Sequence, residues 1–143
     1  MEEALRLAAG AVETGDVPVG ALVLSPGGEI LGSGVNTRER DTDPTGHAEI
    51  NALRDAAHHT GSWRMDGCSL VVTLEPCAMC AGLISQTRVR QVIFGAWDDK
   101  AGAAGSVLDV LREPRLNHWV EVHPGVRAEE SAALLREFFA PRR

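Results

Sequence analysis

Apolar positions in the first third of the chain recur with periods that predict a helix followed by a hairpin. Apolar residues spaced three and four apart predict an amphipathic helix over residues 2–14. We expect its inward face to consist of Ala4, Leu5, Ala8, Ala9 and Val12. Two apolar-rich runs, 17–24 and 29–35, flank a Ser-Pro-Gly-Gly turn, which predicts a β-hairpin. A polar loop is expected over 36–46.

The rest of the chain predicts strands that alternate with helices. The expected elements are a helix over 47–58, a strand over 68–74, a helix over 76–86, a strand over 89–95, a short strand over 119–123 and a helix over 128–140. In the first and last of these helices, the residues expected to face inward are Ile50, Ala52, Leu53 and Ala57, and Ala132, Leu135, Phe138 and Phe139. A glycine- and alanine-rich loop is expected over 96–105.

Two of the predicted strands flank a helix, and this arrangement sets the fold class. Strands 68–74 and 89–95 should be parallel, because a helical crossover joins them, whereas the N-terminal hairpin is antiparallel. The predicted fold is therefore α/β, with a mixed central sheet of about five strands between two layers of helices. With 143 residues, the chain is expected to form one domain over 1–143.

Composition and charge exclude several classes of protein. No apolar run approaches the roughly 18 residues of a membrane span, and the acidic, amphipathic N-terminus does not resemble a signal peptide, so we expect a cytoplasmic protein. The net charge of −6 argues against broad, nonspecific nucleic-acid binding. A local basic patch stays open, and its candidates are Arg88, Arg90, Lys100, Arg112, Arg115, Arg142 and Arg143.

The three cysteines point to redox chemistry or to a metal. An odd number of cysteines without a secretion signal argues against a disulfide framework, and Cys68, at the start of a strand, is expected to be a small buried side chain. Cys77 and Cys80 form a C-x-x-C pair. Pro76 fits the first position of a helix, so both sulfurs should project to one side of its opening turn. The positive end of that helix favours the thiolates that a metal needs.

His47 and Glu49 favour the metal reading of the pair. One imidazole and two thiolates make three protein ligands, and catalytic zinc sites leave the fourth position open for water. Zinc lowers the pKa of that water to about 7. Glu49 begins the same predicted helix as His47, and from there its carboxylate can reach the water and carry protons to a ring nitrogen and a departing amine. The residues match the H-x-E…P-C-x-x-C signature of zinc-dependent base deaminases.

The chain resembles the cytidine deaminase superfamily and, within it, the tRNA-specific adenosine deaminases of bacteria. Outside the zinc motif, the segments that carry the resemblance are 17–21, Asn36, 43–49, 72–77, 94–96, Asp98, 100–106, Asn117-His118 and Phe138-Phe139. The resemblance implies one Zn²⁺ per subunit, a homodimer, and conversion of adenosine to inosine at the wobble position of a tRNA anticodon stem-loop, with an arginine tRNA as the expected substrate. It also implies the fold of a cytidine deaminase.

The same resemblance implies roles for residues around the zinc. Asn36 would hydrogen-bond to the target nucleoside, and Val19 and Ile50 would line the base pocket. Asp98 would contact the ribose or backbone beside the flipped base. Lys100 would help to hold tRNA phosphates, together with Arg142 and Arg143.

Two positions depart from the family pattern and leave the substrate open. Gly46 stands where alanine is usual, and Trp97 stands where a basic residue is common. Trp97 could stack on an unpaired base, as aromatic side chains do in single-stranded RNA recognition, or it could pack within the protein. The alternatives are a deaminase of a free base or nucleoside such as guanine, cytosine or cytidine, and a zinc-bearing RNA-binding or scaffold protein that has lost catalysis.

Overall fold

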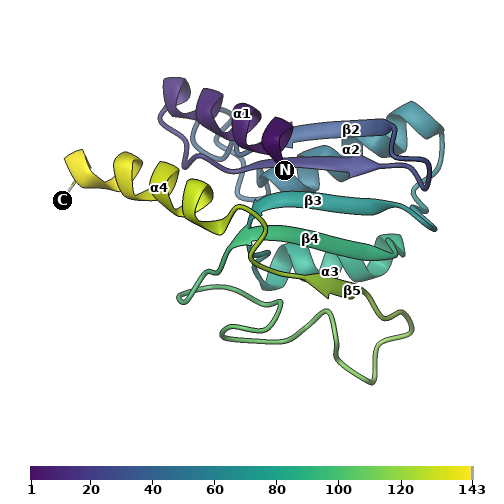
Figure 1. Cartoon of the computed structure of the whole chain (residues 1–143). Helices are drawn as coiled ribbons and strands as arrows, with labels where there is room; N and C mark the ends of the chain where they lie inside the picture. The colour runs from purple at the N-terminus through teal and green to yellow at the C-terminus, as the bar shows by residue number, and fades with distance from the viewer. Residues whose placement is uncertain (143) are drawn as a thin grey trace.

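The computed structural model describes residues 1–142, and its elements follow the predicted order (Figure 1). The helices are α1 (Glu2–Ala11), α2 (Ala48–Thr60), α3 (Ala78–Thr87) and α4 (Ala128–Phe139), with short 3₁₀ helices at Val12–Thr14 and Ala140–Arg142. The strands are β1 (Gly20–Leu24), β2 (Ile30–Val35), β3 (Ser69–Leu74), β4 (Gln91–Ala96) and β5 (Glu121–His123). Within these described residues, none of the helices has the length and apolar character to cross a membrane.

The five strands form one mixed sheet in the order β2-β1-β3-β4-β5. Strand β1 pairs antiparallel with both β2 and β3, and β3-β4 and β4-β5 are parallel. Helices α1 and α4 cover one face of the sheet, and α2 and α3 cover the other (Figure 1). The predicted three-layer α/β/α fold with a mixed sheet is therefore confirmed.

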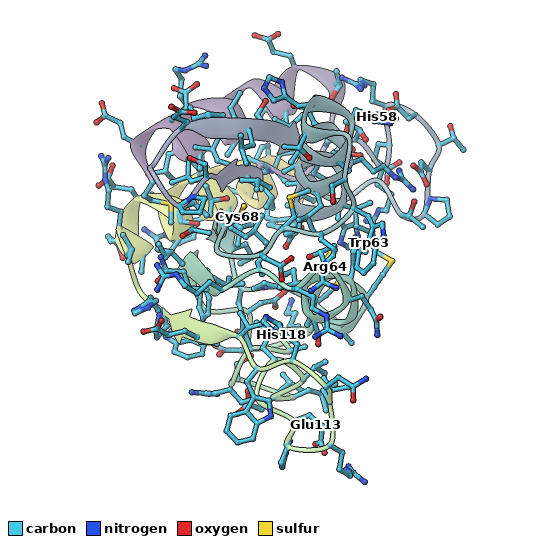
Figure 2. The ribbon with its side chains drawn as sticks, turned by 90° about the vertical axis from the view of Figure 1, so that its right-hand side faces the viewer. His58, Trp63, Arg64, Cys68, Glu113 and His118 are labelled. Atoms are coloured by element: carbon cyan, nitrogen blue, oxygen red, sulfur yellow. The ribbon has the colours of Figure 1, made fainter. Side chains whose placement is uncertain are left out.

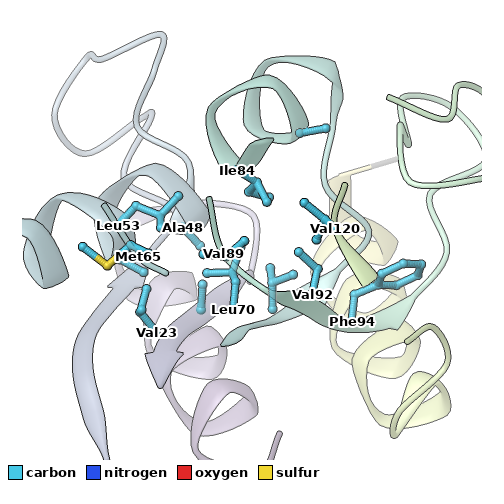
Figure 3. Close-up of a cluster of buried hydrophobic side chains, with 14 of the residues drawn as sticks. Val23, Ala48, Leu53, Met65, Leu70, Ile84, Val89, Val92, Phe94 and Val120 are labelled. Atoms are coloured by element: carbon cyan, nitrogen blue, oxygen red, sulfur yellow. The ribbon is translucent and has the colours of Figure 1, made fainter. Parts of the chain in front are cut away.

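Side chains alternate between the two faces of the central strands and build two cores of unequal size. Ala21 and Val23 of β1 point into the larger core under α2 and α3, whereas Leu22 between them joins Ala4 and Val71 in the smaller core under α1. Figure 3 shows members of the larger core: Val23, Ala48, Leu53, Met65, Leu70, Ile84, Val89, Val92, Phe94 and Val120.

Helix α2 lies against β2 with almost no space between the two backbones. A Cβ atom built on Gly32 would lie 2.4 Å from the backbone nitrogen of Ala56, and one built on Gly34 would lie 2.5 Å from the carbonyl oxygen of Ala48. Only glycine permits such an approach. The contact fixes the beginning of α2, which carries the His-Ala-Glu sequence, relative to the sheet.

Two predicted helix faces were partly wrong. In the N-terminal helix, Ala9 and Val12 are exposed and Ala11 is buried instead. Each helical residue advances by about 100°, so a face centred on Ala4, Ala8 and Ala11 turns Ala9 towards solvent. In α4, Phe138 is buried but Phe139 is exposed for the same reason. Arg143 and the side chain of Arg142, which we expected to contact tRNA, lie outside the described residues.

Candidate metal centre and active site

Two helix beginnings meet at one end of the sheet and bring the predicted metal ligands together. His47 is the N-cap of α2, with φ −88° and ψ 152°, and Cys77 is the N-cap of α3, with φ −76° and ψ 176°. Cys80 lies in the first turn of α3. The positive ends of both helices therefore point at the cluster, which favours thiolate ligands.

The prediction that Pro76 opens α3 was wrong, because that helix begins at Ala78. The contacts of the preceding segment explain the difference. The Pro76 carbonyl accepts a hydrogen bond from Ala103 N–H at 2.7 Å, and Cys77 forms a β-bridge with Gly102. These bonds keep 76–77 extended and make Cys77 a cap. Both sulfurs still lie on the same side.

The three candidate ligands have the spacing of a tetrahedral zinc site. His47 Nδ1 lies 3.7 Å from Cys77 Sγ and 3.5 Å from Cys80 Sγ, and the three ligand atoms lie within 4.8 Å of one another. Zinc bonds of about 2.1 Å to nitrogen and about 2.3 Å to sulfur hold such atoms about 3.6 Å apart at tetrahedral angles. His47, Cys77 and Cys80 therefore fit a zinc ion and leave its fourth position free.

Glu49 lies beside the cluster without belonging to it. Its side chain is 4% exposed, and the Cys80 thiol donates to its Oε2 at 3.5 Å. Burial raises the pKa of Glu49 to about 7, so the carboxyl group can exchange a proton near neutral pH. The hydrogen bond from Cys80 lowers the pKa of Cys77 to about 3, and the bond to Cys77 raises the pKa of His47. A buried carboxyl group and a candidate metal-ligand set thus lie side by side.

A cavity of about 210 Å³ opens onto this cluster. Its lining residues are Val17, Val19, Asn36, Arg38, His47, Ala48, Glu49, Leu74, Glu75, Cys77, Asp98 and Ala101. The lining combines apolar walls with polar groups from several segments of the chain, as small-molecule sites usually do. A planar base that entered the cavity would meet Glu49 and two of the candidate metal ligands, His47 and Cys77.

Three of the five residues expected to bind substrate line this cavity. Val19, Asn36 and Asp98 do so. The Asn36 amide also donates to Val17 O at 3.2 Å and accepts from Arg38 N–H at 3.2 Å, and these bonds fix its orientation. Asp98 Oδ1 accepts from the N–H groups of Lys100 and Ala101, so this side chain also caps its own turn.

The other two residues, Ile50 and Lys100, lie outside the cavity lining. Ile50 lines a separate apolar groove on the outer side of α2 and α3, because it is rotated about 100° around α2 from Glu49. Lys100 is exposed on the loop after Asp98. The prediction that Ile50 lines the base pocket does not agree with this placement.

The Asn117-His118 pair, part of the sequence resemblance, lies away from the cavity. The His118 ring meets Val89 O at 2.6 Å, and Asn117 and His118 line a polar pocket with Arg88 and Arg115. Figure 2 shows His118 with Arg64, Trp63 and the buried Cys68 on the side of the molecule where α2 and α3 end. The basic candidates Arg88 and Arg115 are therefore remote from the metal cluster.

Glu75 is a cavity residue to which the sequence assigned no role. It is 2% exposed, follows the last residue of β3 and lies two positions before the ligand Cys77. Both of its oxygens accept backbone N–H groups from the loop after β4. The only sequence signal was its place beside the Pro-Cys motif; the loop that it binds is far away along the chain.

An α/β/α sheet with a His-Cys-Cys cluster at two helix beginnings and a buried glutamate beside it defines the class of zinc-dependent deaminases. Residues 1–96 match the family model described as the cytidine and deoxycytidylate deaminase zinc-binding region, and the chain belongs to this family. The zinc cofactor predicted from the sequence agrees with this family and with the ligand spacing.

Two proteins and one solved structure are similar to this chain over nearly its whole length. The tRNA-specific adenosine deaminase of Bacillus subtilis is 45% identical over 139 residues, which cover 97% of this chain and 86% of that protein. The tRNA(Ile)-lysidine synthase of Deinococcus deserti is 49% identical over 142 residues, but the chain spans only 26% of its length. A solved structure from a study of A-to-I editing by tRNA:A34 deaminases superimposes with a TM-score of 0.90 and 39% identity, covering 94% of this chain and 97% of that one.

Proposed function

We propose that this protein hydrolyses the exocyclic amine of adenosine, giving inosine and ammonia, at the wobble position of a tRNA anticodon stem-loop. The observation that carries the proposal is the buried Glu49 carboxyl group, placed beside three zinc-type ligands at the wall of an open cavity. Similarity over nearly the whole chain to a tRNA-specific adenosine deaminase supports the choice of substrate.

His47, Cys77 and Cys80 would hold one zinc per subunit. When bound, zinc would lower the pKa of a water molecule to about 7, so that this water could lose a proton near neutral pH and attack the base. Among the described residues, this cluster contains no fourth ligand, which would leave the metal accessible to water and substrate. The two helix beginnings hold the ligands in place and stabilise the thiolates.

Glu49 would be the proton carrier of the reaction. It accepts a proton from the attacking water and delivers protons to the ring nitrogen next to the reacting carbon and to the departing amine. Its burial raises the pKa of the carboxyl group to about 7, so the group can take up and release a proton near neutral pH. Because ammonia leaves only after its nitrogen has been protonated, the reaction needs such a group.

The cavity lining suggests how the target nucleoside would be held. Val19 and Ala48 offer an apolar surface to the base, and Asn36 and Asp98 offer polar groups near its sugar. We keep Lys100 as a phosphate contact, because it is exposed on the loop that begins at Asp98. We assign Ile50 no contact with the base.

We also propose that the protein acts as a homodimer in the cytoplasm, on an arginine tRNA. An apolar groove between α2 and α3, lined in part by Ile50, Leu53, Met79 and Leu83, offers a surface for a second copy. Trp63 at this groove is 61% exposed, which favours a contact that covers it. The tRNA identity rests on the sequence resemblance.

The direct test is inosine formation by zinc-loaded protein on an anticodon stem-loop with adenosine at the wobble position. Free adenosine, cytidine and guanine are assayed in parallel, together with a stem-loop that carries adenosine at a neighbouring position. The proposal predicts conversion of the wobble adenosine alone. Turnover of a free base or nucleoside, with the stem-loop untouched, would keep the zinc chemistry and overturn the substrate.

A further inference from the structure

The carboxylate of Glu75 is enclosed by the loop that follows β4. Its Oε1 accepts the N–H of Asp98 at 2.9 Å, and its Oε2 accepts those of Ala104 at 2.9 Å and Ser106 at 3.1 Å. The side chain is 2% exposed, so these bonds replace the water that a charged carboxylate would otherwise require. Residues 98–106 therefore form a backbone cradle around one acidic group.

Further contacts close this cradle. Gly102 N–H donates to Asp98 O at 2.9 Å, and Ser106 Oγ donates to the same oxygen at 2.8 Å. A Cβ built on Gly102 would lie 2.2 Å from Glu75 Oε1, so only glycine fits against the carboxylate. The loop is folded around Glu75, and its Ala103 and Ala104 side chains are buried in the larger core.

The cradle joins the metal-ligand segment to a wall of the cavity. Glu75 is followed by Pro76 and by the ligand Cys77, and Cys77 itself forms a bridge with Gly102. On the loop side, Asp98 and Ala101 line the cavity. Trp97, immediately before the cradle, is 45% exposed, and its ring meets Phe94 edge-on at 5.0 Å between centroids.

We propose that Glu75 is a positioning residue that holds the 98–106 loop in the shape in which Asp98 and Trp97 meet the RNA around the target adenosine. This inference rests on the proposed function and deepens it. Glu75 acts through the loop and not on the reacting atoms, so its loss should weaken RNA binding far more than the chemical step. The hydrogen bonds of the Glu75 carboxylate go to loop N–H groups, so the zinc ligands should keep their metal.

The test is Glu75→Gln, which keeps the size of the side chain but turns an NH₂ group towards at least one loop N–H. We expect KM for the stem-loop to rise about tenfold, as when one buried donor loses its acceptor, while kcat changes by less than about threefold. Zinc content should stay at one per chain. Hydrogen exchange should accelerate at the amides of Asp98, Ala104 and Ser106 and stay unchanged in α2.

Ser131→Ala is the matched control for a lost buried hydrogen bond. Ser131 donates to Thr73 O on β3 from the opposite face of the sheet, so its loss should lower stability without raising KM. Ser106→Ala removes only the hydroxyl bond to Asp98 O; it should raise KM in the same direction by a smaller factor, which keeps the inference testable if Glu75→Gln does not fold.

Two results would overturn the inference. One is unchanged amide exchange in 98–106 of Glu75→Gln or, if that variant does not fold, an unchanged KM for Ser106→Ala. The other is a fall in kcat with KM unchanged, which would place Glu75 in the chemical step. Because hydrogen exchange and zinc content need no substrate, they report on the cradle even if the stem-loop proves to be the wrong substrate.

Discussion

His47 and Cys77 contribute ligand atoms from two separate helix beginnings, and each should be required for zinc. We expect His47→Ala and Cys77→Ser to lose bound zinc and to unfold at lower denaturant concentration, because metal binding is coupled to folding. Metal analysis of the purified variants measures the effect. Cys68→Ala is the control: it removes a buried thiol outside the cluster and should keep one zinc per chain. Full zinc occupancy in His47→Ala would contradict the ligand assignment.

Trp97 offers an exposed aromatic surface next to the cavity residue Asp98. Base stacking on such a ring contributes about 1–3 kcal/mol, so Trp97→Ala should weaken stem-loop binding by about 5- to 150-fold. Binding can be measured by fluorescence anisotropy with a labelled stem-loop. Trp119→Ala removes a ring that is 65% exposed outside the cavity lining and should leave affinity unchanged. Equal affinities for the two variants would make Trp97 a packing residue.

At the scale of single residues, the sequence predicted the metal set and missed part of its surroundings. Ligand identity and spacing are chemical requirements, so His47, Cys77 and Cys80 could be found without a structure. The place of Ile50 depends on the rotation of α2, where one residue changes the direction by about 100°. Glu75 was missed because its partners lie more than 20 positions later, in a loop whose path no periodic pattern specifies.

The contact between α2 and β2 positions the beginning of α2 and should not tolerate larger residues. In Gly34→Ala, the new methyl group would meet the backbone of α2, and we expect a loss of roughly 1–3 kcal/mol in the free energy of unfolding, together with reduced activity. Urea denaturation measures the first effect. Gly10→Ala has no atom within 4 Å and lies in α1, so it should stabilise the protein by about 0.5–1 kcal/mol. Stability of Gly34→Ala equal to that of the parent would contradict the close contact.

At the scale of elements, the order of helices and strands was predictable because each has its own hydrophobic period. The parallel pairing of β3 and β4 also followed from the helix between them. The beginning of α3 was not predictable, because bonds from the distant residues Gly102 and Ala103 keep Pro76 and Cys77 extended. Local preference for proline at the first helical position gave way to tertiary contacts.

The whole molecule exposes an apolar groove that a second copy could cover. We expect a dimer by light scattering at micromolar concentration, and Trp63→Glu should shift the mass towards the monomer, because it places a charge in that groove. Trp119→Glu adds the same charge at an exposed tryptophan outside the groove and should leave the dimer intact. A monomeric parent protein, or a Trp63→Glu variant that stays dimeric, would contradict this choice of surface.

The net charge of −6 is compatible with the proposed recognition of RNA at a defined site rather than along the whole surface. The metal cluster, the cavity and the cradle lie together at one end of the sheet, and the family match covers residues 1–96, which include the ligands but not the cradle loop. The loop after β4 is therefore the part of the molecule in which substrate choice should be sought.

The proposed chemistry depends most directly on Glu49, and the decisive measurement is the rate of inosine formation with the parent protein and with Glu49→Gln. Both proteins are prepared with zinc content measured, and both act on the wobble-adenosine stem-loop under single-turnover conditions. We predict equal zinc content in the two proteins and a rate lower by about 10²- to 10⁴-fold in the variant, because the proton carrier is lost while the zinc ligands stay. A zinc-loaded Glu49→Gln that forms inosine at the parent rate would contradict the mechanism.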